Sequence, residues 1–248
     1  KKFEFGIHIS DPSTLISPNT LLDKSARNNG SSIYFPEKTI PMLPSQFIKE
    51  FGSLDPSKPR LGLSLLIKTD LNYKIESWRI APSVISTSKS MTYEQASLAL
   101  NHTENSAHQI MLHLWNFSKK QMSSRKQNGA INFQTQEMNI KVNSNSEIEI
   151  TLLNSRLDSR MMVSELMILF NSLAAKFFVE NHIPAIYRHQ PSPNLNNDTD
   201  FDLKQASKNE VSRNYYLVRN LPQTKLTGEP LPHYSLGLQN YIQITSPL

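Results

Sequence analysis

The alternation of apolar and polar residues at the start of the chain predicts a β-strand over residues 2–10. Apolar side chains occupy the odd positions from Phe3 to Ile9, with polar or small residues between them. This period of two is typical of a half-buried strand. Two further apolar-rich runs lie within residues 60–85, on either side of the sequence Thr-Asp-Leu-Asn. Because these residue types favour tight turns, we expect the two runs to form a β-hairpin.

Three later stretches complete the predicted strands. Residues 130–142 and 147–153 read as two strands around the turn sequence Asn-Ser-Asn-Ser, and residues 233–245 read as a final strand. The stretch 31–44 holds prolines at positions 36, 41 and 44. Since proline lacks a backbone N–H and fixes φ, we expect an irregular but ordered loop there. Residues 191–200 are rich in Asn, Asp and Pro and predict another loop.

Four segments carry the signals of helices. Residues 21–30 favour a short helix or turn that ends at Asn-Asn-Gly. A helix is expected to begin near Thr92, because Gln95 three residues later completes a capping box. Another is predicted from about 106 to 126, with Gly129 just beyond its end. Residues 159–180 are apolar on nearly every side of a helix, so we expect this helix to lie buried in the core.

These elements predict one mixed α/β domain of the α+β type over residues 1–248, with a largely antiparallel sheet packed against helices. Such a chain is long enough to bury a core without a disulfide or a metal ion. It contains no cysteine, which excludes a thiolate metal site and a cysteine nucleophile. The longest strongly apolar run is shorter than the roughly 20 residues of a membrane span. A net charge of +5 is compatible with nucleic-acid binding but does not argue for it strongly.

Familiar catalytic motifs are missing from the sequence. It holds no glycine-rich phosphate loop, no HExxH and no GxSxG. The seven histidines do not form a set with metal-ligand spacing. We interpret His108 and His113, five positions apart on a predicted helix, as exposed or capping residues.

Three residues stand out as candidates for function. Glu165 lies in the most apolar segment, where a buried carboxylate is costly unless it is paired or coordinated. A structural ion pair with an arginine such as Arg160 or Arg188 is one interpretation. Tyr34 lies in the proline-rich loop, where spacing alone favours a packing role. Phe133 stands near the start of a predicted strand, where an ordinary core side chain is the simplest interpretation.

Three stretches of the sequence match a known pattern in order. Residues 5–44 read FGIHISDPSTLISPNTLLDKSARNNGSSIYFPEKTIPMLP, residues 159–169 read SRMMVSELMIL, and residues 233–248 read HYSLGLQNYIQITSPL. They resemble the catalytic (RNB) domain of the ribonuclease II and ribonuclease R family. Its corresponding patterns are G-x-H-I-x-D with Y-x-P-x-x-x-I-P-M-L-P, S-R-x-x-V-x-E-x-M-I-L, and H-x-x-L-G-L-x-x-Y-x-x-x-T-S-P-[IL]. The resemblance spans almost the whole chain.

The resemblance implies an exoribonuclease. Family members hydrolyse single-stranded RNA from its 3′ end and release nucleoside 5′-monophosphates, while the last bases stack between aromatic side chains. In that pattern Tyr34 and Phe133 fall at the stacking positions, and Glu165 matches a carboxylate close to the terminal nucleotide. Stacking suits an enzyme that accepts any sequence, because every base has a π-face.

The resemblance also implies a magnesium ion, held by aspartates of the form D-x-D-D just upstream of the first strand, and arginines just after T-S-P-[IL]. The chain begins at Lys1 and ends at Leu248. We therefore expect both elements, and the flanking OB-fold domains, to lie outside it, and we expect the isolated fragment to be inactive. Ser164 stands where many members carry a second acidic residue, which indicates a divergent branch.

Two functions remain open at this point. One is a cytoplasmic, monomeric exoribonuclease that acts on single-stranded RNA with Mg²⁺ and needs no membrane. The other is a catalytically inactive relative that binds RNA or serves as a scaffold. Within the fragment, Tyr34, Phe133 and Glu165 are the predicted RNA-binding residues, and no metal ligand is predicted.

Overall fold

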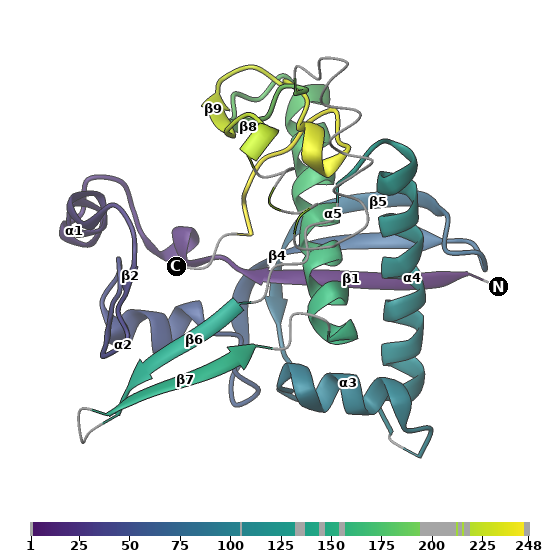
Figure 1. Cartoon of the computed structure of the whole chain (residues 1–248). Coiled ribbons are helices and arrows are strands. Elements are labelled where there is room, and N and C mark those ends of the chain that lie inside the picture. Colours follow the sequence, from purple (N-terminus) through teal and green to yellow (C-terminus); the bar gives the residue numbers. More distant parts are fainter. Residues whose placement is uncertain are drawn as a thin grey trace. The chain divides into compact units, whose positions relative to one another are not determined.

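The chain folds into two compact units in the computed structural model, which describes residues 2–104, 106–131, 137–143, 147–153, 157–193, 212, 215 and 219–245. The first unit comprises Lys1–Asn116, Glu137–Ser159 and Thr245–Leu248, and the second comprises Phe117–Gln136 and Arg160–Ile244. Helices and antiparallel sheets are mixed along the chain (Figure 1), which confirms the predicted α+β class. The interpretation of residues 1–248 as a single catalytic-domain fragment stays a prediction.

A three-stranded antiparallel sheet forms the centre of the first unit (Figure 1). Its strands are β1 (Phe3–Ser10), β4 (Arg60–Thr69) and β5 (Ile75–Ile85), in the order β1-β4-β5. One face carries buried apolar side chains, among them Phe5, Ile7, Leu65 and Ile67. The period of two therefore places the core on this face, and the predicted strand and hairpin are both confirmed.

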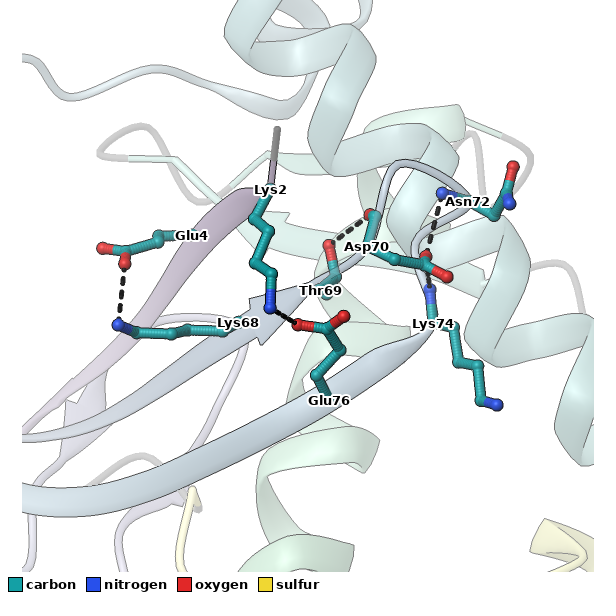
Figure 2. A network of polar contacts seen from close by, with 8 residues as sticks. All are labelled: Lys2, Glu4, Lys68, Thr69, Asp70, Asn72, Lys74 and Glu76. Carbon is teal, nitrogen blue, oxygen red and sulfur yellow. Dashed lines mark hydrogen bonds and ion pairs between the residues drawn. The ribbon is translucent and has the colours of Figure 1, made fainter.

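The turn of the β4–β5 hairpin is held by the Asp70 carboxylate, which accepts hydrogen bonds from the backbone N–H groups of Asn72 at 2.9 Å and Lys74 at 2.8 Å. Tyr73 adopts φ = 61° in this turn, and its ring stacks on Phe3 at a centroid distance of 5.3 Å. Figure 2 shows the turn beside two exposed ion pairs between strands, Lys2–Glu76 and Glu4–Lys68.

The first unit also contains these shorter elements: η1 (Pro12–Leu15), α1 (Leu21–Asn29), β2 (Ile33–Tyr34), β3 (Thr39–Ile40), α2 (Ser45–Phe47), η2 (Ile48–Gly52), β6 (Glu137–Val142) and β7 (Ile148–Leu153). The helix at 21–30 and the strand at 147–153 are confirmed, whereas the strand predicted from residue 130 begins only at Glu137, and residues 132–136 lie outside the described residues. The proline-rich stretch 31–44 was expected to be irregular throughout, which is wrong in part. Two-residue strands pair Tyr34 with Thr39 there, with Pro36 between them and the other two prolines after them.

Three longer helices follow, α3 (Tyr93–Asn101), α4 (His108–Gln127) and α5 (Asp158–Glu180). The capping box predicted at the start of α3 is present: the Thr92 hydroxyl accepts from the Gln95 N–H at 3.2 Å, and the Gln95 side chain accepts from the Thr92 N–H at 2.9 Å. His108 is buried and bonds the carbonyl of Ala99 near the end of α3. It thus caps that helix, but it is not exposed.

Helix α5 buries one stripe rather than its whole circumference. The buried residues of this helix recur every three or four positions, singly or as adjacent pairs, and are Ser159, Met162, Glu165, Leu166, Phe170, Asn171, Ala174 and Ala175. The prediction that this helix lies in the core is therefore confirmed for one stripe of it, while its other residues are half-buried or exposed. By length and composition α5 could cross a membrane, which no other helix among the described residues could; the core helix of a soluble protein passes the same test.

The second unit also contains β8 (Tyr187–His189), β9 (Lys225–Thr227) and η3 (Tyr234–Leu236). Residues 233–245 were predicted as one strand, and this is wrong. Gly237 adopts φ = 63° and reverses the chain, so that His233 pairs with Leu238. After this turn the segment returns to β8, where Ile242 lies opposite Tyr187.

Candidate functional site

Glu165 is buried in α5 and forms an ion pair with Arg125 of α4. The arginine Nε donates to Oε1 at 2.6 Å and Nη2 donates to Oε2 at 2.7 Å. The Arg125 and Glu165 side chains are 16% and 7% exposed, so water screens this pair weakly. The sequence correctly suggested a structural ion pair for this carboxylate, but the suggested partners, Arg160 and Arg188, were wrong.

The third guanidinium nitrogen of Arg125 connects the pair to another segment. Arg125 Nη1 donates to the backbone carbonyl of Leu236 at 2.9 Å. The next residue, Gly237, lies so close to the end of α4 that an added Cβ atom would stand 2.7 Å from the Arg125 carbonyl oxygen. Only glycine combines this close approach with a positive φ at no cost. We call the group of Arg125, Glu165, Leu236 and Gly237 the Arg125 junction.

The residues that follow Arg125 in the chain end helix α4. Gly129 has φ = 87° and donates to the carbonyl of Lys126, while Ala130 donates to the carbonyl of Arg125 at 2.9 Å. These two bonds form the Schellman motif that ends many helices. The following residue, Ile131, donates to the Ser235 carbonyl at 2.9 Å. The turn after α4 is therefore bound to the turn around Gly237 by backbone contacts.

A second buried polar side chain of α5 binds the segment after Gly237. Asn171 is 2% exposed, and its Nδ2 donates to the Tyr241 hydroxyl at 3.0 Å. Its Oδ1 accepts from the backbone N–H of Ile244 at 3.1 Å. Both ends of the amide are thus used, and residues 241–244 have a defined position against α5.

His233 is buried beside Tyr241, with their rings edge to face at 5.7 Å. Burial lowers the pKa of His233 to about 4, and the neighbouring charge of Arg188 acts in the same direction. In the described part of the chain its Nδ1 has no hydrogen-bond partner. The imidazole is therefore neutral at physiological pH.

Tyr34, the first predicted RNA-stacking residue, lies at the end of β2 with its side chain 66% exposed. The neighbouring Phe35 is 48% exposed, and its N–H donates to the Lys38 carbonyl in the β2–β3 turn. An aromatic ring left this open has a face available for stacking and makes a small contribution to the core. Exposure thus argues against the packing role that spacing alone favoured.

The predicted RNA-binding residues do not all lie in one unit. Phe133 lies outside the described residues. Tyr34 belongs to the first unit and Glu165 to the second, and each is described within its own unit. A contact between Glu165 and a terminal ribose stays a prediction.

The described residues do not fit the magnesium ion that the resemblance implies. Nowhere in the described ranges do three His, Asp or Glu side chains gather where they could hold a metal ion. Asp11, at the end of β1, instead accepts hydrogen bonds from the hydroxyls of Ser13 and Thr14. We therefore assign no catalytic step to a metal site formed by the described residues.

Sequence reasoning missed Arg125 and Asn171. Arg125 stands in the last turn of a predicted helix, where a basic residue is usual and draws no attention. Asn171 interrupts the apolar run of residues 159–180, as Glu165 does. A buried amide needs partners as a buried carboxylate does, so this interruption was the available signal.

Comparisons with known proteins identify the family of this chain. The sequence model of the family described as "RNB domain" matches residues 1–248. An uncharacterized ribonuclease of Synechocystis sp. is 34% identical over 98% of this chain and 36% of its own length. The chain spans about a third of the length of the curated relatives that it matches first.

Two solved structures share the fold. Ribonuclease R of Mycoplasma genitalium, in complex with ribose-methylated single-stranded RNA, has a TM-score of 0.84 and 24% identity, covering 98% of this chain and 43% of that one. Yeast Ssd1, a pseudonuclease, has a TM-score of 0.75 and 19% identity, covering 99% of this chain and 34% of that one. The family match extends over every residue, and the chain belongs to the RNB domain family.

Proposed function

We propose that the protein is a hydrolytic exoribonuclease that shortens single-stranded RNA from its 3′ end and releases nucleoside 5′-monophosphates. The observation that carries the proposal is the RNB domain match over residues 1–248. The names of its relatives support it, since they include ribonucleases R and a ribonuclease II. So does the RNA held by the ribonuclease R structure of the same fold.

In this proposal Tyr34 and Phe133 stack on bases near the 3′ end. The exposure of the Tyr34 ring supports its part. Stacking on an aromatic side chain contributes ~1–3 kcal/mol per base and is tolerant of sequence. Discrimination of RNA from DNA requires contacts to the 2′-hydroxyl. From the resemblance, Glu165 is a candidate for such a contact.

Magnesium enters the proposal as an ion held by residues other than those described, which the resemblance places before the first strand. Such an ion would supply activation of the attacking water and stabilisation of the leaving oxygen. We expect the chain of 248 residues on its own to release no mononucleotides, because the resemblance places the aspartates for this ion before the first strand.

A catalytically inactive RNA-binding protein is the second candidate. It is favoured by the likeness of this chain to yeast Ssd1, a pseudonuclease, with a TM-score of 0.75. The two candidates share the stacking residues and differ in hydrolysis.

The experiment that separates them uses the natural protein that contains this chain. Single-stranded RNA and DNA of one sequence are offered with Mg²⁺, and binding and hydrolysis are followed in parallel. We expect tight RNA binding with hydrolysis of RNA alone. Tight RNA binding without hydrolysis would favour the inactive relative. If the protein neither bound nor hydrolysed RNA, both candidate functions would be wrong.

A further inference from the structure

We propose that a groove on the outer face of the β1–β4–β5 sheet binds a nucleoside monophosphate, with His8 at the base and Arg79 at the phosphate. The outer face carries Gly6 and His8 of β1, which alternate along the strand with the buried Phe5 and Ile7. The groove has a volume of about 660 Å³, and all three strands line it. This volume lies within the range of small-molecule sites. The inference goes beyond the proposed exoribonuclease function and does not depend on it.

The imidazole of His8 is held in one orientation by its neighbours. Its Nδ1 lies 2.6 Å from the hydroxyl oxygen of Ser64, a side chain that is 1% exposed. The ring lies over Gly6, where an added Cβ atom would stand 2.9 Å from the imidazole Cε1 and closer still to Nε2. A glycine in a strand often marks such a close approach of another group. The sequence Gly-x-His therefore leaves room for the ring to lie along the sheet.

A chain of hydroxyl groups determines which nitrogen of His8 carries the proton. The Ser83 hydroxyl donates to the Gly62 carbonyl at 3.1 Å, so its oxygen accepts from Ser64, 2.5 Å away. The Ser64 proton is thereby used, and the Ser64 oxygen accepts from Nδ1–H of His8. Burial lowers the pKa of His8, so the imidazole is neutral at physiological pH. Its Nε2 thus presents a lone pair, which has no hydrogen-bond partner within the described ranges.

Arg79 supplies the free positive charge of the groove. It is exposed on β5 and lies opposite Leu66 of β4, which in turn lies opposite Gly6 of β1. Among the residues that the structure describes, its guanidinium has no ion-pair partner. The other cation that lines the groove, Lys68, is paired with Glu4 at 3.2 Å (Figure 2). Arg79 is therefore the groove cation that is available to an anion.

The spacing of these groups matches the two ends of a nucleotide. Neighbouring strands lie about 4.8 Å apart, so the row from Gly6 across Leu66 to Arg79 spans about 10 Å. A nucleoside monophosphate has a doubly charged phosphate at one end and N–H donors on the base at the other. The guanidinium fits the phosphate, and the Nε2 lone pair of His8 fits a base N–H. The half-buried Leu66 side chain between them offers apolar surface.

Two ligands separate the two ends of the groove. Adenosine 5′-monophosphate carries both base and phosphate, whereas ribose 5-phosphate carries the phosphate alone. Their dissociation constants for the natural protein are measured by titration calorimetry, and a thermal melt shows that each variant is folded. The titrations contain neither Mg²⁺ nor RNA, so their result does not depend on whether the protein hydrolyses RNA.

Three variants and one control complete the design. Arg79→Gln removes the charge, His8→Phe replaces the acceptor by an apolar ring, and Gly6→Ala displaces the imidazole while keeping it. The matched control is Lys74→Gln, which removes the same charge from the turn of the same hairpin, outside the groove.

We expect Arg79→Gln to weaken both ligands on the order of 10-fold to 100-fold, because it removes a hydrogen bond between two charged groups. His8→Phe and Gly6→Ala should weaken adenosine 5′-monophosphate by ~3-fold to 10-fold and leave ribose 5-phosphate unchanged, because the second ligand has no base. Lys74→Gln should bind both ligands as the wild type does.

The same nucleotide is a product of the proposed hydrolysis, so its binding position is checked separately. With selectively labelled histidine, the nuclear magnetic resonance signal of the His8 Nε2 should shift on addition of adenosine 5′-monophosphate and not on addition of ribose 5-phosphate. The inference is overturned if the wild type binds neither ligand, if Arg79→Gln and His8→Phe bind both as the wild type does, or if the His8 signal stays in place. A loss of affinity for single-stranded RNA in Arg79→Gln, without any binding of the free nucleotide, would assign the groove to an RNA strand and also overturn it.

Discussion

Arg125 and Glu165, forty positions apart in the sequence, meet through two parallel hydrogen bonds of 2.6 and 2.7 Å between α4 and α5. Glu165 is unusual in the sequence because it interrupts an apolar helix. The structure gives its carboxylate a definite partner, Arg125. The pair changes what is expected when either residue is replaced. It gives Glu165 a structural partner within the second unit.

Glu165→Gln should lower the free energy of unfolding by ~3–5 kcal/mol, because it leaves the Arg125 guanidinium buried without its counter-charge. Denaturant unfolding of the 248-residue chain measures this directly. The control is Glu180→Gln, which breaks an exposed pair and should cost less than about 1 kcal/mol. Equal stability of wild type and Glu165→Gln would show that the ion pair does not hold the second unit together.

Tyr34→Ala should weaken RNA binding by ~1–3 kcal/mol per lost stacking contact, while stability changes by less than about 1 kcal/mol because the ring is largely exposed. Binding of a fluorescent single-stranded RNA to the natural protein and a thermal melt of the same sample check both parts. Phe133→Ala is expected to act in the same direction on RNA binding.

The control for Tyr34 is Leu21→Ala, an apolar side chain of α1 that is 87% exposed and has no predicted contact with RNA. It should leave the affinity for RNA unchanged. If Tyr34→Ala binds RNA as tightly as Leu21→Ala does, Tyr34 is not a stacking residue.

Stability should decrease as the pH falls from about 6.5 to about 4, because of His233. Burial, together with the Arg188 charge, lowers the pKa of His233 from 6.5 to about 4 in the folded protein. Within this window the unfolded chain binds a proton that the folded chain does not, so acid favours unfolding. Denaturant unfolding of wild type and His233→Gln at several pH values should show a flatter pH dependence in the variant. Parallel curves for the two proteins would mean that His233 titrates normally when folded.

Local patterns predicted the elements whose formation depends on neighbouring residues. The strand at β1 follows from strict alternation, and the start of α3 follows from Thr92 and Gln95, which lie one helical turn apart. The predicted strand at 233–245 failed at a single residue, because alternation does not reveal that Gly237 reverses the chain. The three-residue strands β8 and β9 are too short to show a period.

The sequence pattern could not predict the long-range contacts, for a different reason. The choice of Arg125 over Arg160 or Arg188 as the partner of Glu165 depends on where α4 passes α5, which no local signal encodes. The burial of α5 on one stripe likewise depends on which neighbours cover it. The candidate site was therefore predictable as a set of unusual residues, whereas its connections required the folded structure.

Product analysis on the natural protein tests the central claim most directly. Single-stranded RNA labelled at its 5′ end is incubated with the protein and Mg²⁺, and both the labelled remainder and the released species are identified over time. The account predicts a ladder that shortens by one nucleotide at a time from the 3′ end, with nucleoside 5′-monophosphates as the released product. Intact RNA after prolonged incubation, or early release of the 5′ label on a mononucleotide, would contradict it.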